Sequence, residues 1–137
     1  MDYSTRATAL FAAGYNCAQS AFLPFAEALE MSQPQAARLT NCLGGGFAGT
    51  GGVCGALAGA CLALSGKYGR ELPEREGEQL ARQETVYRLV RELHEAFALE
   101  FGSTLCDALL ERGLCASGEQ GDARFLCPQY VRRAVEL

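Results

Sequence analysis

Apolar positions recur at helical spacing along most of the chain, and no stretch alternates apolar and polar residues long enough to predict a strand. The clearest pattern has apolar residues at intervals of four, three, four and four positions: Val86, Val90, Leu93, Phe97 and Phe101. This pattern predicts a long helix over about residues 74–101, beginning after a proline and ended by a glycine. The chain as a whole is predicted to be all-α, a compact helical bundle.

The N-terminal third is expected to hold two helices. The first covers about residues 4–13, has its first serine as the cap, and ends at Gly14. The second is capped by Asn16 and covers about residues 16–30. Pro24 is expected to kink this helix because proline removes one of its internal hydrogen bonds.

A third helix is predicted to start at Ser32 and to reach about Leu39. A glycine-rich loop over residues 44–52 follows, and a fourth helix of about 53–68 comes after it. Beyond the long helix we expect a short helix at 103–110, a loop at 113–124 and a last helix at 128–137.

The fourth helix is unusually rich in small residues. Gly51, Gly55 and Gly59 recur every four positions, so its backbone can approach a neighbouring helix closely. Residues 39–66 carry no charge and are long enough to span a bilayer, but nine of them are glycine, which would leave backbone groups unsatisfied in lipid. We therefore predict a buried central helix and no membrane insertion.

Composition bounds the class of protein. At 137 residues, with 49% hydrophobic and 20% charged residues, the chain suits a single globular domain over residues 1–137. The formal net charge is −4 and the basic residues are dispersed, so nucleic acid is not an expected partner. The N-terminus lacks the basic and apolar regions of a signal peptide, and we expect a cytoplasmic protein with reduced thiols.

Seven cysteines are too many for an ordinary enzyme of this size, and four of them share one kind of position. Cys17, Cys54, Cys106 and Cys127 each fall at or near a predicted helix start. The positive end of the helix dipole there favours a thiolate, the form that attacks disulfides or binds metal. The spacings of 37, 52 and 21 residues include no Cys-x-x-Cys pair. A purely structural role as small buried residues is the competing interpretation.

The other cysteines, the histidine and the glycine loop are weaker candidates for a functional site. Cys61 lies inside an apolar stretch and is expected in the core, Cys42 borders the glycine loop, and Cys115 falls in a predicted surface loop. His94 is the only histidine and is expected at the edge of the core, which disfavours His-rich zinc sites and Ser-His-Asp catalysis. The glycine loop lacks the Lys-Ser or Lys-Thr of a phosphate-binding loop, but its N–H groups could donate to sulfur or to an anionic ligand.

These residues resemble a known family. Residues 14–19 read Gly-Tyr-Asn-Cys-Ala-Gln, and Cys-Gly-Ala-x-x-Gly follows at residues 54–59, with lone cysteines at 106 and 127. This order resembles the C_GCAxxG_C_C family of redox-active proteins over nearly the whole chain. A similar domain occurs in split-Soret cytochromes with an iron–sulfur cluster, so the resemblance implies such a cluster on the four cysteines. It implies no haem here, because no Cys-x-x-Cys-His is present.

Three functions follow as hypotheses. The first is an electron-transfer protein or oxidoreductase whose four helix-start cysteines hold an iron–sulfur cluster, beside the backbone of Gly51, Gly52, Gly55 and Gly59. The second is a metal-free thiol oxidoreductase in which two of these cysteines cycle between dithiol and disulfide. The third is a binding module for a soft metal such as copper or zinc, or for a small ligand under the glycine loop. A redox partner and homodimer formation are further expectations.

Overall fold

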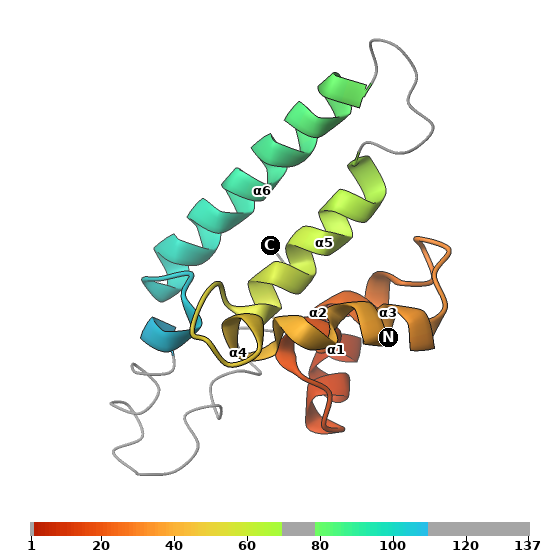
Figure 1. The fold of residues 1–137 in the computed structure, drawn as a ribbon, viewed down its shortest axis with the longest axis vertical. Helices are drawn as coiled ribbons and strands as arrows, with labels where there is room; N and C mark the ends of the chain where they lie inside the picture. Colours follow the sequence, from red (N-terminus) through yellow and green to blue (C-terminus); the bar gives the residue numbers. More distant parts are fainter. Residues whose placement is uncertain (1, 70–78, 110–137) are drawn as a thin grey trace.

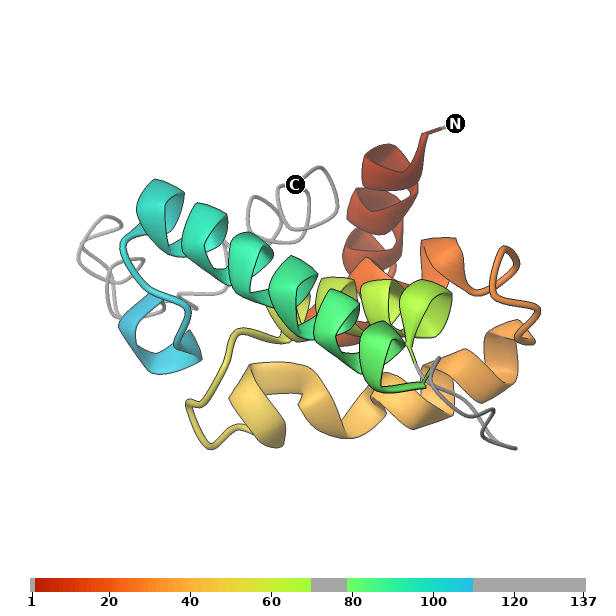
Figure 2. The same cartoon turned by 90° about the horizontal axis from the view of Figure 1, so that it is seen from above.

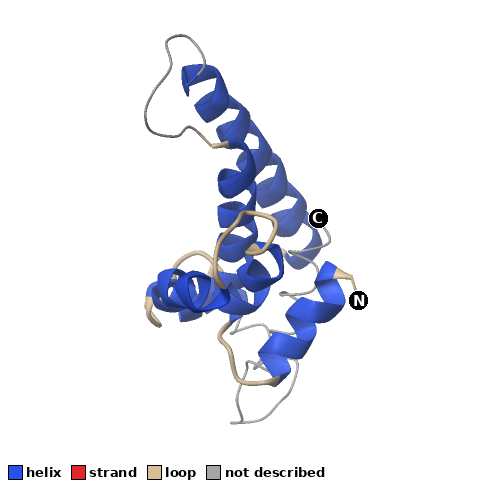
Figure 3. Cartoon of the chain, turned by 90° about the vertical axis from the view of Figure 1, so that its right-hand side faces the viewer, coloured by secondary structure: helices blue, strands red, loops and turns tan. Residues whose placement is uncertain are grey.

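The computed structural model describes residues 2–69 and 79–109. Within these ranges the regular secondary structure is helical, and the one β-type pairing is an isolated bridge between Val53 and Leu105 (Figure 3). The predicted all-α fold is therefore confirmed. The expected loop at 113–124 and helix at 128–137 lie outside the described residues.

Two long helices run side by side, and the shorter ones gather around one end of this pair (Figure 1). Seen from above, α6 lies on one side of α5 and α1 lies on the other (Figure 2). A further helical stretch starts at residue 106. The elements are α1 (Tyr3–Ala12), α2 (Cys17–Phe22), the 3₁₀ turn η1 (Leu23–Phe25), α3 (Gln33–Thr40), the 3₁₀ turn η2 (Asn41–Leu43), α4 (Gly44–Phe47), α5 (Gly55–Tyr68) and α6 (Gln79–Phe101).

Helix α1 begins with a different cap from the one predicted. Asp2 is the N-cap, and its carboxylate accepts a hydrogen bond of 2.7 Å from the backbone N–H of Thr5. Ser4 lies inside the first turn, where its hydroxyl donates to the same carboxylate. Hydrogen bonds from Thr5 and then Ser4 lower the pKa of Asp2 to about 2. A carboxylate accepts more strongly than a hydroxyl, so Asp2 is the better cap.

The second predicted helix is shorter than expected. Helix α2 ends at Phe22, and Pro24 lies in the 3₁₀ turn that follows. Pro24 therefore ends the helix, where the sequence analysis predicted a kink. Residues 23–25 form a tighter turn in place of another α-helical turn because proline supplies no N–H and crowds the preceding turn.

Small residues bring α5 against α2, as the spacing of the glycines predicts. A Cβ added to Gly59 would lie 2.6 Å from the backbone oxygen of Ala18 and 2.9 Å from the Cβ of Ala21. Helix α5 also supplies the fully buried Leu57 to the main core, which it shares with Phe97 of α6. Helix α5 is thus the central element of the bundle.

The long helix α6 covers the predicted pattern from residue 79 onward. Val86, Leu93 and Phe97 are buried, and the rings of Phe97 and Phe101 meet at a centroid separation of 4.8 Å. Gly102, with φ of +86°, ends the helix in a conformation that favours glycine. Among the described residues, no helix combines the length and hydropathy needed to cross a bilayer.

Candidate functional site

Three of the four helix-start cysteines occupy helix N-termini in the structure. Cys17 is the first residue of α2, Cys54 is the N-cap of α5, and Cys106 is the first residue of the helical stretch after α6. Cys54 and Cys106 are buried, and Cys17 is half-buried. Cys127 lies outside the described residues.

Backbone hydrogen bonds hold the Cys54 and Cys106 segments together. The N–H of Cys54 donates to the carbonyl of Thr104 at 2.7 Å, and the N–H of Cys106 donates to the carbonyl of Gly52 at 2.6 Å. The bridge between Val53 and Leu105 lies between these two bonds. Two helix starts that are more than fifty residues apart in the sequence are therefore fixed next to each other.

The thiols of Cys17, Cys54 and Cys106 interact electrostatically with one another. A charge on Cys17 or Cys106 raises the pKa of Cys54, and a charge on Cys17 raises the pKa of Cys106. Cys17 also packs against the core cluster that contains Cys54. The structure thus brings together three of the four predicted cysteines. We call these three residues the cysteine centre.

Burial opposes the expected thiolate character. Burial is the main cause that raises the pKa of Cys54 to about 12, while the backbone N–H groups of Leu57 and Ala56 lower it to a smaller extent. The pKa of Cys106 is also raised, first by burial and then by the charges of Cys17 and Asp107. The expectation that helix N-termini make these thiols acidic is therefore wrong for Cys54 and Cys106, because desolvation outweighs the helix dipole.

The glycine-rich loop packs against the centre through its backbone. Gly46 has φ of +72°, and a Cβ there would come within 2.8 Å of the Cβ of Cys106. The N–H groups of Gly49, Gly51 and Gly52 donate to carbonyls of the same loop. These three N–H groups are therefore used within the loop and are not offered to sulfur or to a ligand. Its left-handed residues fold the backbone into turns that use them internally.

Of the predicted glycines, Gly55 borders a sulfur atom directly and Gly52 lies against the backbone of the glycine-rich loop. A Cβ on Gly55 would overlap the Sγ of Cys17 and would lie 3.2 Å from the backbone nitrogen of Ala18. A Cβ on Gly52 would lie 3.1 Å from the carbonyl oxygen of Gly46. Gly55 thus leaves room for a thiol that any larger residue would displace.

The other two predicted glycines contact protein groups. Gly51 lies against the carboxylate of Asp107, where a Cβ would overlap it, and Gly59 lies against α2. Gly51 therefore shapes the rim of the cysteine centre. Gly59 serves the helix contact described above.

The start of α2 confirms the predicted Asn16 cap, and sequence reasoning missed the part that Gln19 plays in positioning Cys17. Asn16 and Gln19 form a reciprocal capping box around the start of α2. Asn16 also donates to the carbonyl of Asn41 at 2.9 Å, and Gln19 donates to the carbonyl of Ala37 at 2.9 Å. The Asn-x-x-Gln pattern at residues 16–19 signals the capping box. The two longer contacts depend on the tertiary fold.

The remaining candidates are not part of the cysteine centre or lie outside the described residues. Cys42 is exposed, and Cys115 is outside the described residues. Cys61 is half-buried at the edge of the core, where burial raises its pKa to about 11. Its Sγ lies 3.9 Å from the Nδ1 of His94. His94 is half-buried, as the sequence predicts.

No cluster of three or more His, Cys, Asp or Glu side chains in the described ranges is arranged to hold a single metal ion. The cysteine centre is therefore a group of neighbouring thiols, held together by the backbone hydrogen bonds and close contacts described above.

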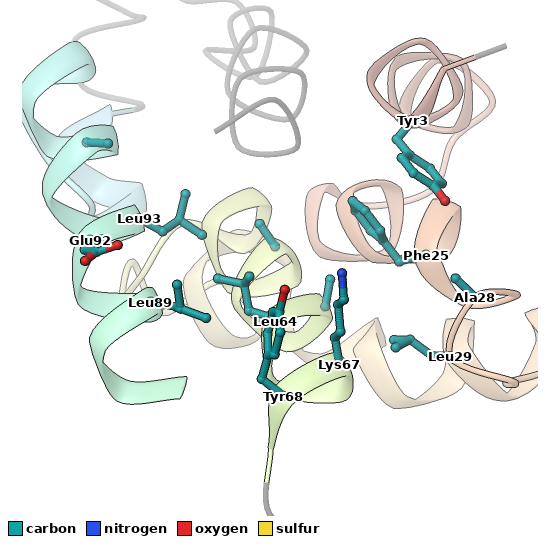
Figure 4. Close-up of a pocket in the computed structure, with 13 residues that line it drawn as sticks. Tyr3, Phe25, Ala28, Leu29, Leu64, Lys67, Tyr68, Leu89, Glu92 and Leu93 are labelled. Atoms are coloured by element: carbon teal, nitrogen blue, oxygen red, sulfur yellow. The ribbon is translucent and has the colours of Figure 1, made fainter. Parts of the chain in front are cut away.

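An apolar groove lies away from the glycine loop, toward the C-terminal half of α5 (Figure 4). Its volume is about 550 Å³, and aliphatic and aromatic side chains line most of it. Its polar groups come from Tyr3 of α1, Lys67 and Tyr68 of α5 and Glu92 of α6. The groove does not include the cysteine centre. It therefore does not correspond to the ligand site expected under the glycine loop.

Comparison with known proteins places the chain in a family. A protein of Archaeoglobus fulgidus, described as uncharacterized, is 34% identical over 125 residues, which cover 89% of this chain and 81% of that protein. No solved structure matches the chain. The model of the C_GCAxxG_C_C family, whose description reads "Putative redox-active protein", matches residues 15–137. This match includes every cysteine of the sequence, and the chain therefore belongs to the C_GCAxxG_C_C family.

Proposed function

We propose that Cys17, Cys54 and Cys106, with Cys127 as the fourth ligand, hold an iron–sulfur cluster that transfers electrons. The observation that carries this proposal is the meeting of three thiols from distant parts of the chain. Backbone hydrogen bonds join the Cys54 and Cys106 segments, and the Sγ of Cys17 lies against Gly55, the residue after Cys54. A redox role agrees with the description of the family. A cluster bound there would accept and donate single electrons.

The burial of these thiols favours metal ligation over disulfide exchange. A thiol attacks a disulfide as the thiolate, and Cys54 with a pKa of about 12 forms almost none near neutral pH. A metal ion displaces the proton of a cysteine and then compensates the charge of the sulfur. Buried cysteines can thus serve as ligands where they would be poor nucleophiles.

The arrangement of the thiols suits a cluster better than a mononuclear ion. In a [4Fe–4S] cluster each cysteine binds a different iron, so the ligand sulfurs stay apart from one another. In a mononuclear site all ligands meet at one ion. Among the described residues no group of three or more ligating side chains could hold a metal ion, which disfavours a mononuclear site at the three neighbouring thiols.

The protein around the thiols would tune and protect such a group. Cys17, Cys54 and Cys106 each stand at a helix N-terminus, whose positive end stabilises the negative charge of thiolate ligands. Gly46 and Gly55 let backbone and sulfur come closer than larger residues allow. The apolar core that includes Leu57 and Phe97 lies on the inner side of Cys54 and limits access of water.

Oxygen-free purification tests this assignment against the two other classes of function. The account predicts a coloured protein with visible charge-transfer absorption, and with iron and acid-labile sulfide in comparable amounts per chain. The colour should bleach on reduction with dithionite. A colourless protein after reconstitution with iron and sulfide, or one that binds only zinc or copper, contradicts the proposal.

A further inference from the structure

Outside the cysteine centre, a thiol and an imidazole face each other across the two long helices. Cys61 of α5 and His94 of α6 place Sγ and Nδ1 at 3.9 Å. Both side chains are half-buried, and neither lines the apolar groove. Cys61 lies seven residues after Cys54, which corresponds to about 10 Å along the helix. The pair is thus separate from the centre and has no role in the proposed function.

We propose that Cys61 and His94 form a second metal site, which binds one monovalent soft ion, Cu(I), between Sγ and Nδ1. Thiolate sulfur and imidazole nitrogen are both ligands that copper accepts, and a soft monovalent ion favours sulfur. On binding, Cys61 loses its thiol proton to solvent and Nδ1 donates its lone pair. No change of oxidation state occurs.

The observed separation fits an ion held between the two atoms. Metal–sulfur and metal–nitrogen bonds of about 2.3 and 2.0 Å span about 4.3 Å when the three atoms are in line. The 3.9 Å between Sγ and Nδ1 is shorter by a few tenths of an ångström, which small side-chain rotations supply. The carbonyl of Val90 lies 3.3 Å from the same nitrogen and accepts a hydrogen bond when Nδ1 carries the ring proton. Metal binding at Nδ1 therefore requires this proton to move to Nε2 and replaces the bond to Val90.

Charge selects a monovalent ion. One thiolate and Cu(I) together are neutral, and a neutral pair is tolerated at the edge of an apolar core. Zn²⁺ on the same two ligands would leave one positive charge and would require about two further ligands. Among the described residues no third His, Cys, Asp or Glu joins the pair to form a metal-holding group. Two-coordinate Cu(I) needs none.

The single histidine of the sequence makes this site directly observable. We suggest titrating nitrogen-15-labelled full-length protein with Cu(I) under oxygen-free conditions while following the imidazole resonances by NMR. The proposal predicts a large shift of the Nδ1 signal in the wild type and in the control Cys42→Ser, whose thiol is exposed and belongs neither to the pair nor to the cysteine centre. The same signal should stay in place in Cys61→Ser.

Copper counting provides a second measurement that does not depend on one variant. Cys61→Ser and His94→Gln should each bind one Cu(I) fewer per chain than the wild type, whatever the cysteine centre binds. An imidazole signal unmoved at copper saturation overturns the proposal, as does a shift that persists in Cys61→Ser. Either result leaves the iron–sulfur assignment untouched, because that assignment is read from iron and sulfide.

Discussion

At the scale of single residues, burial and the helix dipole have opposite effects on the pKa of the thiols in the cysteine centre. Position at a helix N-terminus is visible in the sequence and favours a thiolate. Burial depends on the tertiary fold, and in Cys54 it dominates, so that the pKa rises to about 12. The position of a cysteine along a helix therefore does not by itself predict its reactivity.

The raised pKa of Cys54 predicts that Cys54 is alkylated more slowly than the exposed Cys42. At pH 8 the thiolate fraction of Cys54 is about 10⁻⁴, and it increases tenfold per pH unit toward pH 12. We expect iodoacetamide to modify the exposed Cys42 at least a hundredfold faster than Cys54 in metal-free protein, as measured by peptide mass spectrometry. Equal rates at the two cysteines would show that Cys54 is neither buried nor protonated.

A second residue-scale prediction concerns the space beside Cys17. Gly55→Ala should lower the free energy of unfolding by roughly 1–3 kcal/mol, because its Cβ overlaps the Sγ of Cys17. Gly66→Ala is the matched control in the same helix, since its Cβ meets only the end of the Leu29 side chain. The control should be neutral or stabilised by up to about 1 kcal/mol, as expected for alanine in a helix. Denaturant titration distinguishes the two, and equal effects would contradict the close contact.

At the scale of elements, helices with a strong periodic pattern could be predicted, and their ends less well. Helices α3 and α6 follow the expected ranges over the described residues because apolar spacing and end signals agree. The start of α1 was misjudged because Asp2 and Ser4 are both good caps, and only their hydrogen bonds distinguish them. Pro24 allowed either a kink or an end, and tertiary packing selected the end.

The start of α2 gives a prediction at this scale. Asn16→Ala removes the capping bond to Gln19 and the bond to the carbonyl of Asn41, and should lower the free energy of unfolding by about 1 kcal/mol or slightly more. Asn16→Asp keeps an acceptor for the Gln19 N–H and should recover part of that loss. Thermal unfolding followed by circular dichroism checks the order. If the alanine variant is as stable as the wild type, the capping box does not contribute to the position of Cys17.

At the scale of the whole molecule, the central feature is the meeting of chain segments that are far apart in the sequence. The sequence indicates which cysteines stand at helix starts, but the meeting itself depends on the bridge between residues 53 and 105 and on the packing of α5 against α2. The bridge has no local sequence signal, and the glycine spacing of α5 predicts a close helix contact without identifying α2 as the partner. The contact between Cys61 and His94 likewise could not be predicted, because it joins two helices whose relative rotation the sequence does not determine.

The most direct test of this account is the iron and acid-labile sulfide content of three single variants after oxygen-free reconstitution. Cys17→Ser, Cys54→Ser and Cys106→Ser should each lose most of the cluster absorption and bound iron, because all three residues are proposed as ligands of one cluster. Cys42→Ser, which changes an exposed thiol, should retain both. If the three variants retain wild-type iron and sulfide, or if only one of them differs, the three cysteines do not act as one centre.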